Sequence, residues 1–95
     1  MNDELPIIHD REENVFEIII DNEIASLKYR HPDAAHLEIY STFVPESMKG
    51  KGIASLLTFA AFEFAVEHRL KVIPTCSYTQ LWVERNPQSK EFVEA

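Results

Sequence analysis

The chain contains little glycine, cysteine and positive charge. Of its 95 residues, two are glycine and one is cysteine, and 16 Asp and Glu against nine Lys and Arg give a formal net charge of −7. Because Cys76 has no second cysteine to pair with, an internal disulfide is excluded. The acidic balance argues against nucleic acid and anionic membranes as partners, since phosphate contacts need a basic surface. Amine-bearing partners fit this charge better.

The sequence also lacks a hydrophobic run long enough to cross a bilayer, and residues 1–4 do not resemble the start of a signal peptide. We therefore expect a cytoplasmic protein. The length corresponds to one small domain, 1–95, for which we expect a monomer or a weak dimer. The histidines His9, His31, His36 and His68 share no ligand-like spacing, and the single cysteine, Cys76, is distant from them. We therefore predict no metal site.

Short β-rich runs separated by polar turns fill the first half of the chain. They predict strands at 6–10, 15–21, 24–30 and 36–44. From Gly52 to about His68, apolar residues recur every three or four positions, which predicts a helix buried along most of its length.

After this helix, an apolar run at 70–76 predicts a strand and 77–85 a second helix. Strand, helix and strand form a βαβ unit, so the strands at 36–44 and 71–76 should be parallel, with a right-handed crossover. The residues Phe92 and Val93 either pack back on the body or fray. Together these elements predict an α/β (α+β) fold in which N-terminal antiparallel strands precede the βαβ unit and a C-terminal helix, with a mixed sheet.

Both glycines, Gly50 and Gly52, fall in the turn between the predicted strand at 36–44 and the long helix. Such a turn suggests backbone amides directed at an anion near the positive end of the helix dipole. The spacing excludes a Walker A loop, because one residue separates the glycines and Ile53 follows them. A dinucleotide fingerprint fails as well, because Ser55 stands at the third glycine position. A turn of successive amides suits a pyrophosphate.

The residues 43–57 and 70–78 together resemble the short GNAT-type N-acetyltransferases, over a match from about Tyr40 to Pro87. The resemblance is to the minimal subgroup, which is little more than an acetyl-CoA-binding core. It implies a GNAT-like mixed sheet, acetyl-CoA as cosubstrate and an amine as acceptor. Two positions depart from the pattern: Ser41-Thr42 replaces a usual His-Thr pair, and Ser47 replaces a usual Arg or Gln.

The resemblance also implies which residues hold CoA. The pyrophosphate would rest on amides of the glycine turn, and pantetheine would pair with the end of the preceding strand, so that the thioester lies between two splayed parallel strands. The implied residues are Phe43, Val44, Met48, Lys49, Gly50, Lys51, Gly52, Ile53 and Ala54. Asn86, with Arg85, would either reach the 3′-phosphate of CoA or cap the end of the second helix.

Three side chains are candidates for catalysis. Cys76 ends the second parallel strand just before a helix, whose dipole would lower the thiol pKa and favour a nucleophile or a proton donor. The alternative is a small buried side chain. Ser41 would order a water that relays the amine proton. By analogy with many GNAT enzymes, Tyr78 would protonate the departing thiolate; otherwise it packs in the core.

These residues predict an acetyl-CoA-dependent N-acetyltransferase that acetylates a primary amine of a small molecule or a protein lysine. The transfer would occur by direct attack or through an acetylated Cys76. The alternative is a CoA-binding or protein-interaction module without turnover on the same fold.

Overall fold

A computed structural model describes residues 6–94 and contains a five-stranded sheet whose spatial order follows the sequence. The strands are β1 (Ile8–Asp10), β2 (Val15–Ile20), β3 (Glu23–Arg30), β4 (His36–Phe43) and β5 (Lys71–Pro74). Neighbouring strands from β1 to β4 are antiparallel, whereas β5 runs parallel to β4. The predicted mixed α/β sheet is confirmed.

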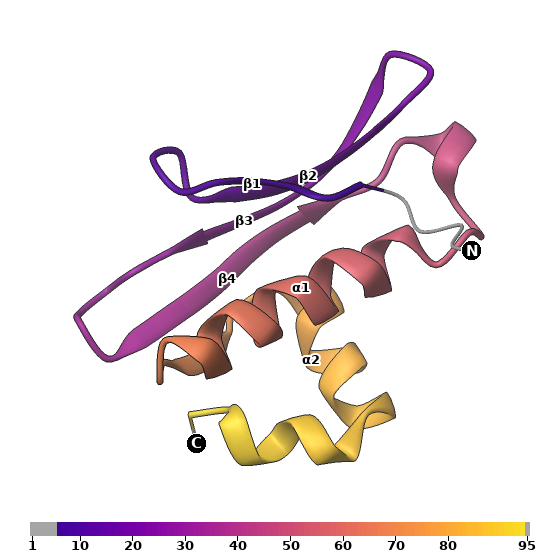
Figure 1. The fold of residues 1–95 in the computed structure, drawn as a ribbon. Helices are drawn as coiled ribbons and strands as arrows, with labels where there is room; N and C mark the ends of the chain where they lie inside the picture. The colour runs from indigo at the N-terminus through magenta and orange to yellow at the C-terminus, as the bar shows by residue number, and fades with distance from the viewer. Residues whose placement is uncertain (1–5, 95) are drawn as a thin grey trace.

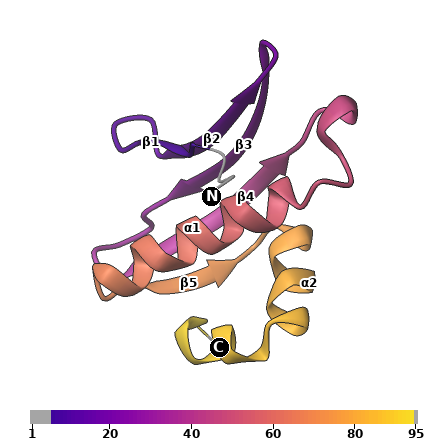
Figure 2. The same cartoon turned by 45° about the vertical axis from the view of Figure 1, so that its right-hand side comes forward.

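The helices gather on one side of this sheet (Figures 1 and 2). Helix α1 (Ile53–Glu67) connects β4 to β5, and α2 (Ser77–Arg85) follows β5 with the predicted bounds. Two short 3-10 helices, η1 (Glu46–Met48) and η2 (Pro87–Phe92), flank them; neither was predicted. Within residues 6–94, no helix has the length and apolar character needed to cross a membrane.

The two N-terminal hairpins follow from their turn residues. The Asp10 carboxylate accepts hydrogen bonds from the amides of Glu12 and Glu13, both at 3.0 Å. Between β2 and β3, Asp21 and Asn22 both have positive φ angles, of 50° and 68°. Two consecutive residues of this kind form the type I′ turn that matches the twist of paired strands.

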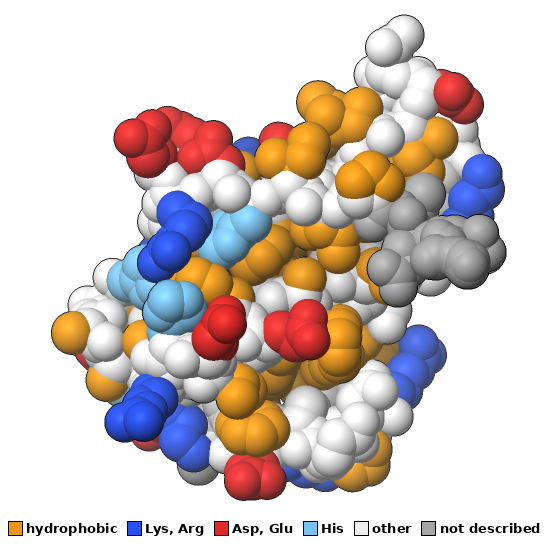
Figure 3. Space-filling view, viewed as in Figure 1, with side chains coloured by type: hydrophobic (Ala, Val, Ile, Leu, Met, Phe, Trp, Pro, Cys, Tyr) orange, Lys and Arg blue, Asp and Glu red, His pale blue; other side chains and the backbone are white. Residues whose placement is uncertain are grey.

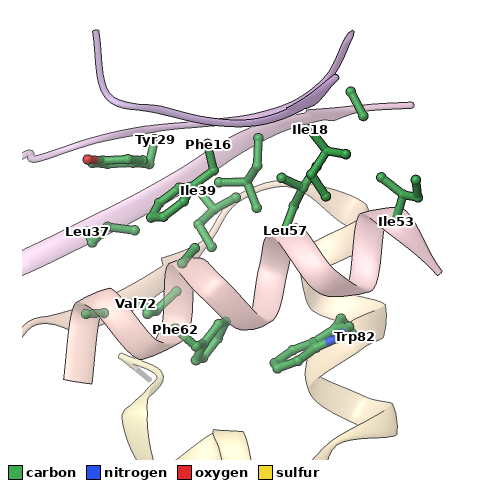
Figure 4. Close-up of a cluster of buried hydrophobic side chains, with 14 of the residues drawn as sticks. Phe16, Ile18, Tyr29, Leu37, Ile39, Ile53, Leu57, Phe62, Val72 and Trp82 are labelled. Atoms are coloured by element: carbon green, nitrogen blue, oxygen red, sulfur yellow. The ribbon is translucent and has the colours of Figure 1, made fainter. Parts of the chain in front are cut away.

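The core lies between the helix-facing side of the sheet and α1, as the close-up in Figure 4 shows. It is built from alternate strand residues and one face of α1: Phe16, Ile18, Ala25, Leu27, Leu37, Ile39 and Val72 from the sheet, with Ile53, Leu57, Ala61, Phe62 and Ala65 from α1. Trp82 and Val83 of α2 join the same cluster.

Helix α1 is buried along most of its length, from Ile53 to Ala65, but on one face only. Leu56, Phe59 and Val66 are 40%, 54% and 42% exposed. The helix is apolar on nearly all sides, but the sheet covers only one of them, and α2 and η2 cover the rest incompletely.

The C-terminal tail packs back on the body. Val93 forms a parallel bridge with Val72 of β5, and the amide of Glu94 donates to the Val72 carbonyl at 2.8 Å. The Glu94 carboxylate lies 3.1 Å from Nε2 of His36 at the start of β4. The tail therefore covers the outer edge of β5.

A β-bulge in β4 changes which side chains face the helices. Lys28 of β3 pairs with Ser41, but the next residue, Tyr29, pairs with Ile39, which leaves Tyr40 as an extra residue in β4. Thr42, opposite the buried Leu27, consequently lies on the helix side of the sheet.

Candidate active site

A pocket of about 590 Å³ lies where β4 ends, the glycine turn begins and α2 passes the start of α1. It brings together eight of the predicted CoA-binding residues and Tyr78: Phe43, Val44, Met48, Lys49, Gly50, Gly52, Ile53 and Ala54. Thr42, Ser55 and Arg85 complete the lining. Lys51, Asn86, Ser41 and Cys76 are not part of it.

The two glycines of the turn adopt a left-handed backbone. The φ angle is 80° at Gly50 and 75° at Gly52, and Gly52 is the N-cap of α1. A Cβ atom added at either position would meet nothing within 4 Å. Backbone conformation therefore favours glycine here, and the space beside both residues is open.

The start of α1 presents amides without acceptors. The first bond of the helix runs from the Leu56 amide to the Gly52 carbonyl, at 3.0 Å. The preceding amides of Ile53, Ala54 and Ser55 donate to no atom of residues 6–94. Free amides at the positive end of a helix dipole form a site for an anion, so this cradle fits a diphosphate.

The turn is anchored on both sides. Ser47, which replaces the usual Arg or Gln, donates its hydroxyl to the Glu23 carboxylate of β3 at 2.9 Å. Met48 is buried, and its amide donates to the Pro45 carbonyl at 2.9 Å. Lys49 lies 3.4 Å from the exposed Glu46 carboxylate. Ser47 therefore ties the turn to the sheet, although it stands where the family usually has Arg or Gln.

Arg85 and Asn86 face different parts of the molecule. Arg85 lines the pocket beside the glycine turn. Asn86 lines a second cavity of about 620 Å³ between α1, α2 and η2, which contains no residue of the glycine turn. The side-chain amide of Asn86 donates to the Trp82 carbonyl at 2.8 Å. Asn86 is therefore the C-cap of α2, whereas Arg85 lies beside the pocket, which Lys49 also lines.

Cys76 is the half-buried N-cap residue of α2, next to the pocket. Its amide donates to the Ile39 carbonyl at 2.9 Å, and its thiol lies 3.6 Å from the Thr42 hydroxyl oxygen. Partial burial raises the thiol pKa, but hydrogen bonds from the Thr79 amide, the Thr42 hydroxyl and other groups outweigh it, and the pKa lies below its ordinary value. Ionisation of this sulfur is thus favoured.

Tyr78 reaches the pocket from the first turn of α2. Burial raises the pKa of its hydroxyl above the ordinary value, although Arg85 and the Ser55 hydroxyl act in the opposite direction. The Ser55 hydroxyl also accepts a hydrogen bond from the Trp82 indole at 2.9 Å. Tyr78 therefore remains a protonated donor at neutral pH.

The β-bulge at Tyr40 places Ser41 on the opposite face of the sheet from the pocket. Ser41 pairs with Lys28, on the face of the sheet away from the core, while Thr42 lies at the pocket beside Cys76. Sequence reasoning did not select Thr42, because strict alternation along the strand predicts the opposite faces for Ser41 and Thr42.

None of the four histidines lines the pocket. The Nε2 atom of His9 lies 2.6 Å from the Tyr29 hydroxyl, and His31, His68 and Arg11 pack around the same aromatic cluster. Figure 3 shows histidine side chains gathered on one face beside a basic side chain. Within residues 6–94, no three His, Cys, Asp or Glu side chains form a group that could hold a metal ion.

Comparison with known proteins agrees with this architecture. Residues 15–92 match the GCN5-related N-acetyl-transferase family. The chain belongs to this family. The family resemblance expected from the glycine turn and the segment 70–78 is therefore confirmed.

Relatives of this GCN5-related chain include Protein NATD1 of several vertebrates. Protein NATD1 of Xenopus tropicalis is 36% identical over 81 residues, which cover 83% of this chain and 74% of that protein. Protein NATD1 of Homo sapiens is also 36% identical over 81 residues, with 83% and 72% covered.

A solution structure of a GCN5-like N-acetyltransferase candidate from Staphylococcus aureus has the same fold. It superposes with a TM-score of 0.78 at 29% identity, and the match covers 99% of this chain and 92% of that one. The GNAT-like fold of this family member is thus shown by both sequence and structure.

Proposed function

We propose that this chain is an N-acetyltransferase that moves the acetyl group of acetyl-CoA to a primary amine. The observation that carries the proposal is the row of amides from Ile53 to Ser55 at the start of α1, which donate to no atom of residues 6–94 and open on a pocket beside Cys76 and Tyr78. Membership in the GCN5-related family supports the same reaction class.

The pocket offers each part of CoA a matching group. The amides of the glycine turn and of α1 would bind the diphosphate. The backbone of Phe43 and Val44, at the end of β4, would pair with the amide groups of pantetheine. The guanidinium of Arg85, beside the pocket, would bind the 3′-phosphate.

The thioester would lie where β4 and β5 stop pairing. Their last paired residues are Ile39 and Pro74, and Thr42 and Cys76 follow on the two sides of the opening. In the direct route, the nitrogen of a neutral amine attacks the acetyl carbon and the bond from that carbon to the CoA sulfur breaks. The Tyr78 hydroxyl gives a proton to the departing thiolate, the nitrogen releases one proton to solvent as it becomes an amide, and Tyr78 takes a proton back from solvent.

In the covalent route, the Cys76 thiolate attacks the acetyl carbon and CoA leaves as a thiolate. The amine nitrogen then attacks the acetyl-cysteine, the new bond from carbon to the Cys76 sulfur breaks, and the amide product departs. The sulfur of Cys76, whose pKa is below its ordinary value, suits this first step.

Acceptor-dependent release of free CoA from acetyl-CoA tests the proposal. A panel of small primary amines and lysine-containing peptides should include an acceptor that raises thiol release above the rate without acceptor. Calorimetry with acetyl-CoA provides the second measurement. Binding without acceptor-dependent release across the panel would favour the non-catalytic CoA-binding module. Absence of binding would contradict both of these functions and leave the protein-interaction module.

A further inference from the structure

Two threonines of the helices are fully buried, but only one of them uses its hydroxyl. Thr58 in α1 and Thr79 in α2 are both 0% exposed. Thr58 donates to the Ala54 carbonyl one turn earlier, at 2.8 Å. The Thr79 hydroxyl has no hydrogen-bond partner within the part of the chain that the structure describes. A buried hydroxyl without a partner is disfavoured, so its retention calls for a reason.

The usual partner of a helical threonine already accepts another donor at Thr79. That partner would be the carbonyl of Thr75, four residues earlier. The side-chain amide of Gln80 donates to this carbonyl at 3.3 Å and to the Pro74 carbonyl at 3.0 Å. The Thr79 hydroxyl makes no bond to this carbonyl, and another acceptor remains open to it.

The candidate acceptor is the sulfur of Cys76. Cys76 is the N-cap of α2 and Thr79 stands three residues later, at the position whose backbone amide an N-cap side chain faces. The sulfur lies 3.6 Å from the Thr42 hydroxyl oxygen on its β4 side. The Thr79 amide, then the Thr42 hydroxyl and the Tyr78 amide, lower the pKa of this sulfur, and the Thr79 hydroxyl contributes in the same direction.

We propose that Thr79 is a positioning residue whose buried hydroxyl is kept free to donate a hydrogen bond to the thiolate of Cys76. A neutral thiol is a weak acceptor, whereas a thiolate is a strong one, so the hydroxyl gains its partner only when Cys76 ionises. Thr42 and Thr79 then hold the charged sulfur from β4 and from α2. The inference deepens the proposed acetyl transfer, because the same thiolate would accept the acetyl group.

Alkylation of Cys76 by iodoacetamide tests the inference without CoA or an amine. The thiolate displaces iodide and forms a carbon–sulfur bond, and intact mass follows the reaction because the chain has one cysteine. Thr79→Val keeps the shape and removes the hydroxyl, whereas Thr79→Ser retains a hydroxyl. Thr58→Val removes the other buried threonine hydroxyl and is the matched control.

We expect Thr79→Val to move the inflection of the pH–rate profile upward and to slow alkylation near neutral pH by about three- to tenfold, the effect of one hydrogen bond to a charged group. Thr79→Ser should restore most of the rate, and Thr58→Val should leave the profile unchanged. Unfolding by urea should show that Thr58→Val lowers stability, because it loses a bond, while Thr79→Val does not.

An unchanged profile in folded Thr79→Val would overturn the inference. An equal shift in Thr58→Val would also contradict it, because the effect would then be general. If Thr79→Val does not fold, Thr79→Ala provides the same comparison, read by the ultraviolet absorbance of the thiolate. A shifted profile without amine-dependent CoA release would leave the inference standing and reject the acetyl transfer.

Discussion

The thiol of Cys76 and the hydroxyl of Thr42 meet across the opening between β4 and α2, with 3.6 Å between sulfur and oxygen. The bulge at Tyr40 makes this contact possible, because it turns Thr42 to the helix side of the sheet. The contact places a polar group of β4 beside the only thiol of the chain, next to the pocket that the glycine turn opens.

Replacement of Cys76 by alanine tests the covalent route. We expect Cys76→Ala to abolish any acetyl adduct and to lower kcat for thiol release by about a hundredfold, because the nucleophile or proton donor is lost. Intact mass after exposure to acetyl-CoA and steady-state thiol release provide the two measurements. Calorimetry with CoA is the control and should give unchanged affinity. Undiminished turnover would eliminate the covalent route.

The glycine turn is better tested with asparagine than with valine. A β-branched residue at the φ angle of 75° found at Gly52 is strained, so Gly52→Val would lower stability as well as affinity. Asn tolerates this conformation, and its side chain would occupy the open space beside the amides. We expect Gly52→Asn to lower stability by about 1 kcal/mol or less and to weaken CoA binding at least about tenfold.

The control for Gly52→Asn is Asn14→Ala, which strains a left-handed position in the hairpin between β1 and β2 and lies outside the pocket. It should lower the melting temperature while CoA affinity stays the same. Calorimetry and thermal unfolding measure both variants. Equal CoA affinity in folded Gly52→Asn would show that the phosphate path does not pass this residue.

Arg85 should recognise the 3′-phosphate of CoA. We expect Arg85→Gln to weaken CoA binding by about tenfold, the effect of one charge-assisted contact, and to change dephospho-CoA binding much less. Lys90→Gln, at an exposed position in η2 outside the pocket, is the charge-matched control. The same loss for both ligands would place the role of Arg85 elsewhere in the pocket.

The cluster around His9 should make the fold sensitive to acid. Burial, followed by the charge of Arg11, lowers the His9 pKa below its ordinary value of 6.5. Below that pH the unfolded chain binds the proton more readily than the folded one, so stability is lost as the pH falls toward the folded pKa. We expect His9→Gln to reduce the loss of unfolding free energy between about pH 7 and pH 5, measured in urea.

His36 provides a control of opposite sign. Hydrogen bonds to Asp33 and Glu94 raise its pKa above 6.5. Its contribution to stability is therefore present below that pH and is lost as the pH rises through the folded pKa. His36→Gln should enlarge the loss of unfolding free energy as the pH falls. An identical pH profile of stability in the unmodified protein, His9→Gln and His36→Gln would contradict the roles given to both histidines.

Much of the fold was predictable because it depends on local patterns. Asp21 and Asn22 favour a type I′ turn, apolar residues every three or four positions after Gly52 specify α1, and the break before residue 77 sets the start of α2. The glycine turn was also recognisable, since only glycine readily adopts the backbone of Gly50 and Gly52. These signals are carried by residues close together in the chain.

The sequence by itself therefore determined the strands, the helices α1 and α2, the parallel pairing of β4 with β5 and the family of this protein. Only the tertiary structure decided that Thr42 rather than Ser41 contacts Cys76, that Arg85 rather than Asn86 faces the pocket, and that the Thr79 hydroxyl has no partner among residues 6–94. The physical reason is that a bulge in one strand and the rotation of a helix about its axis depend on packing between distant segments, which no local pattern encodes.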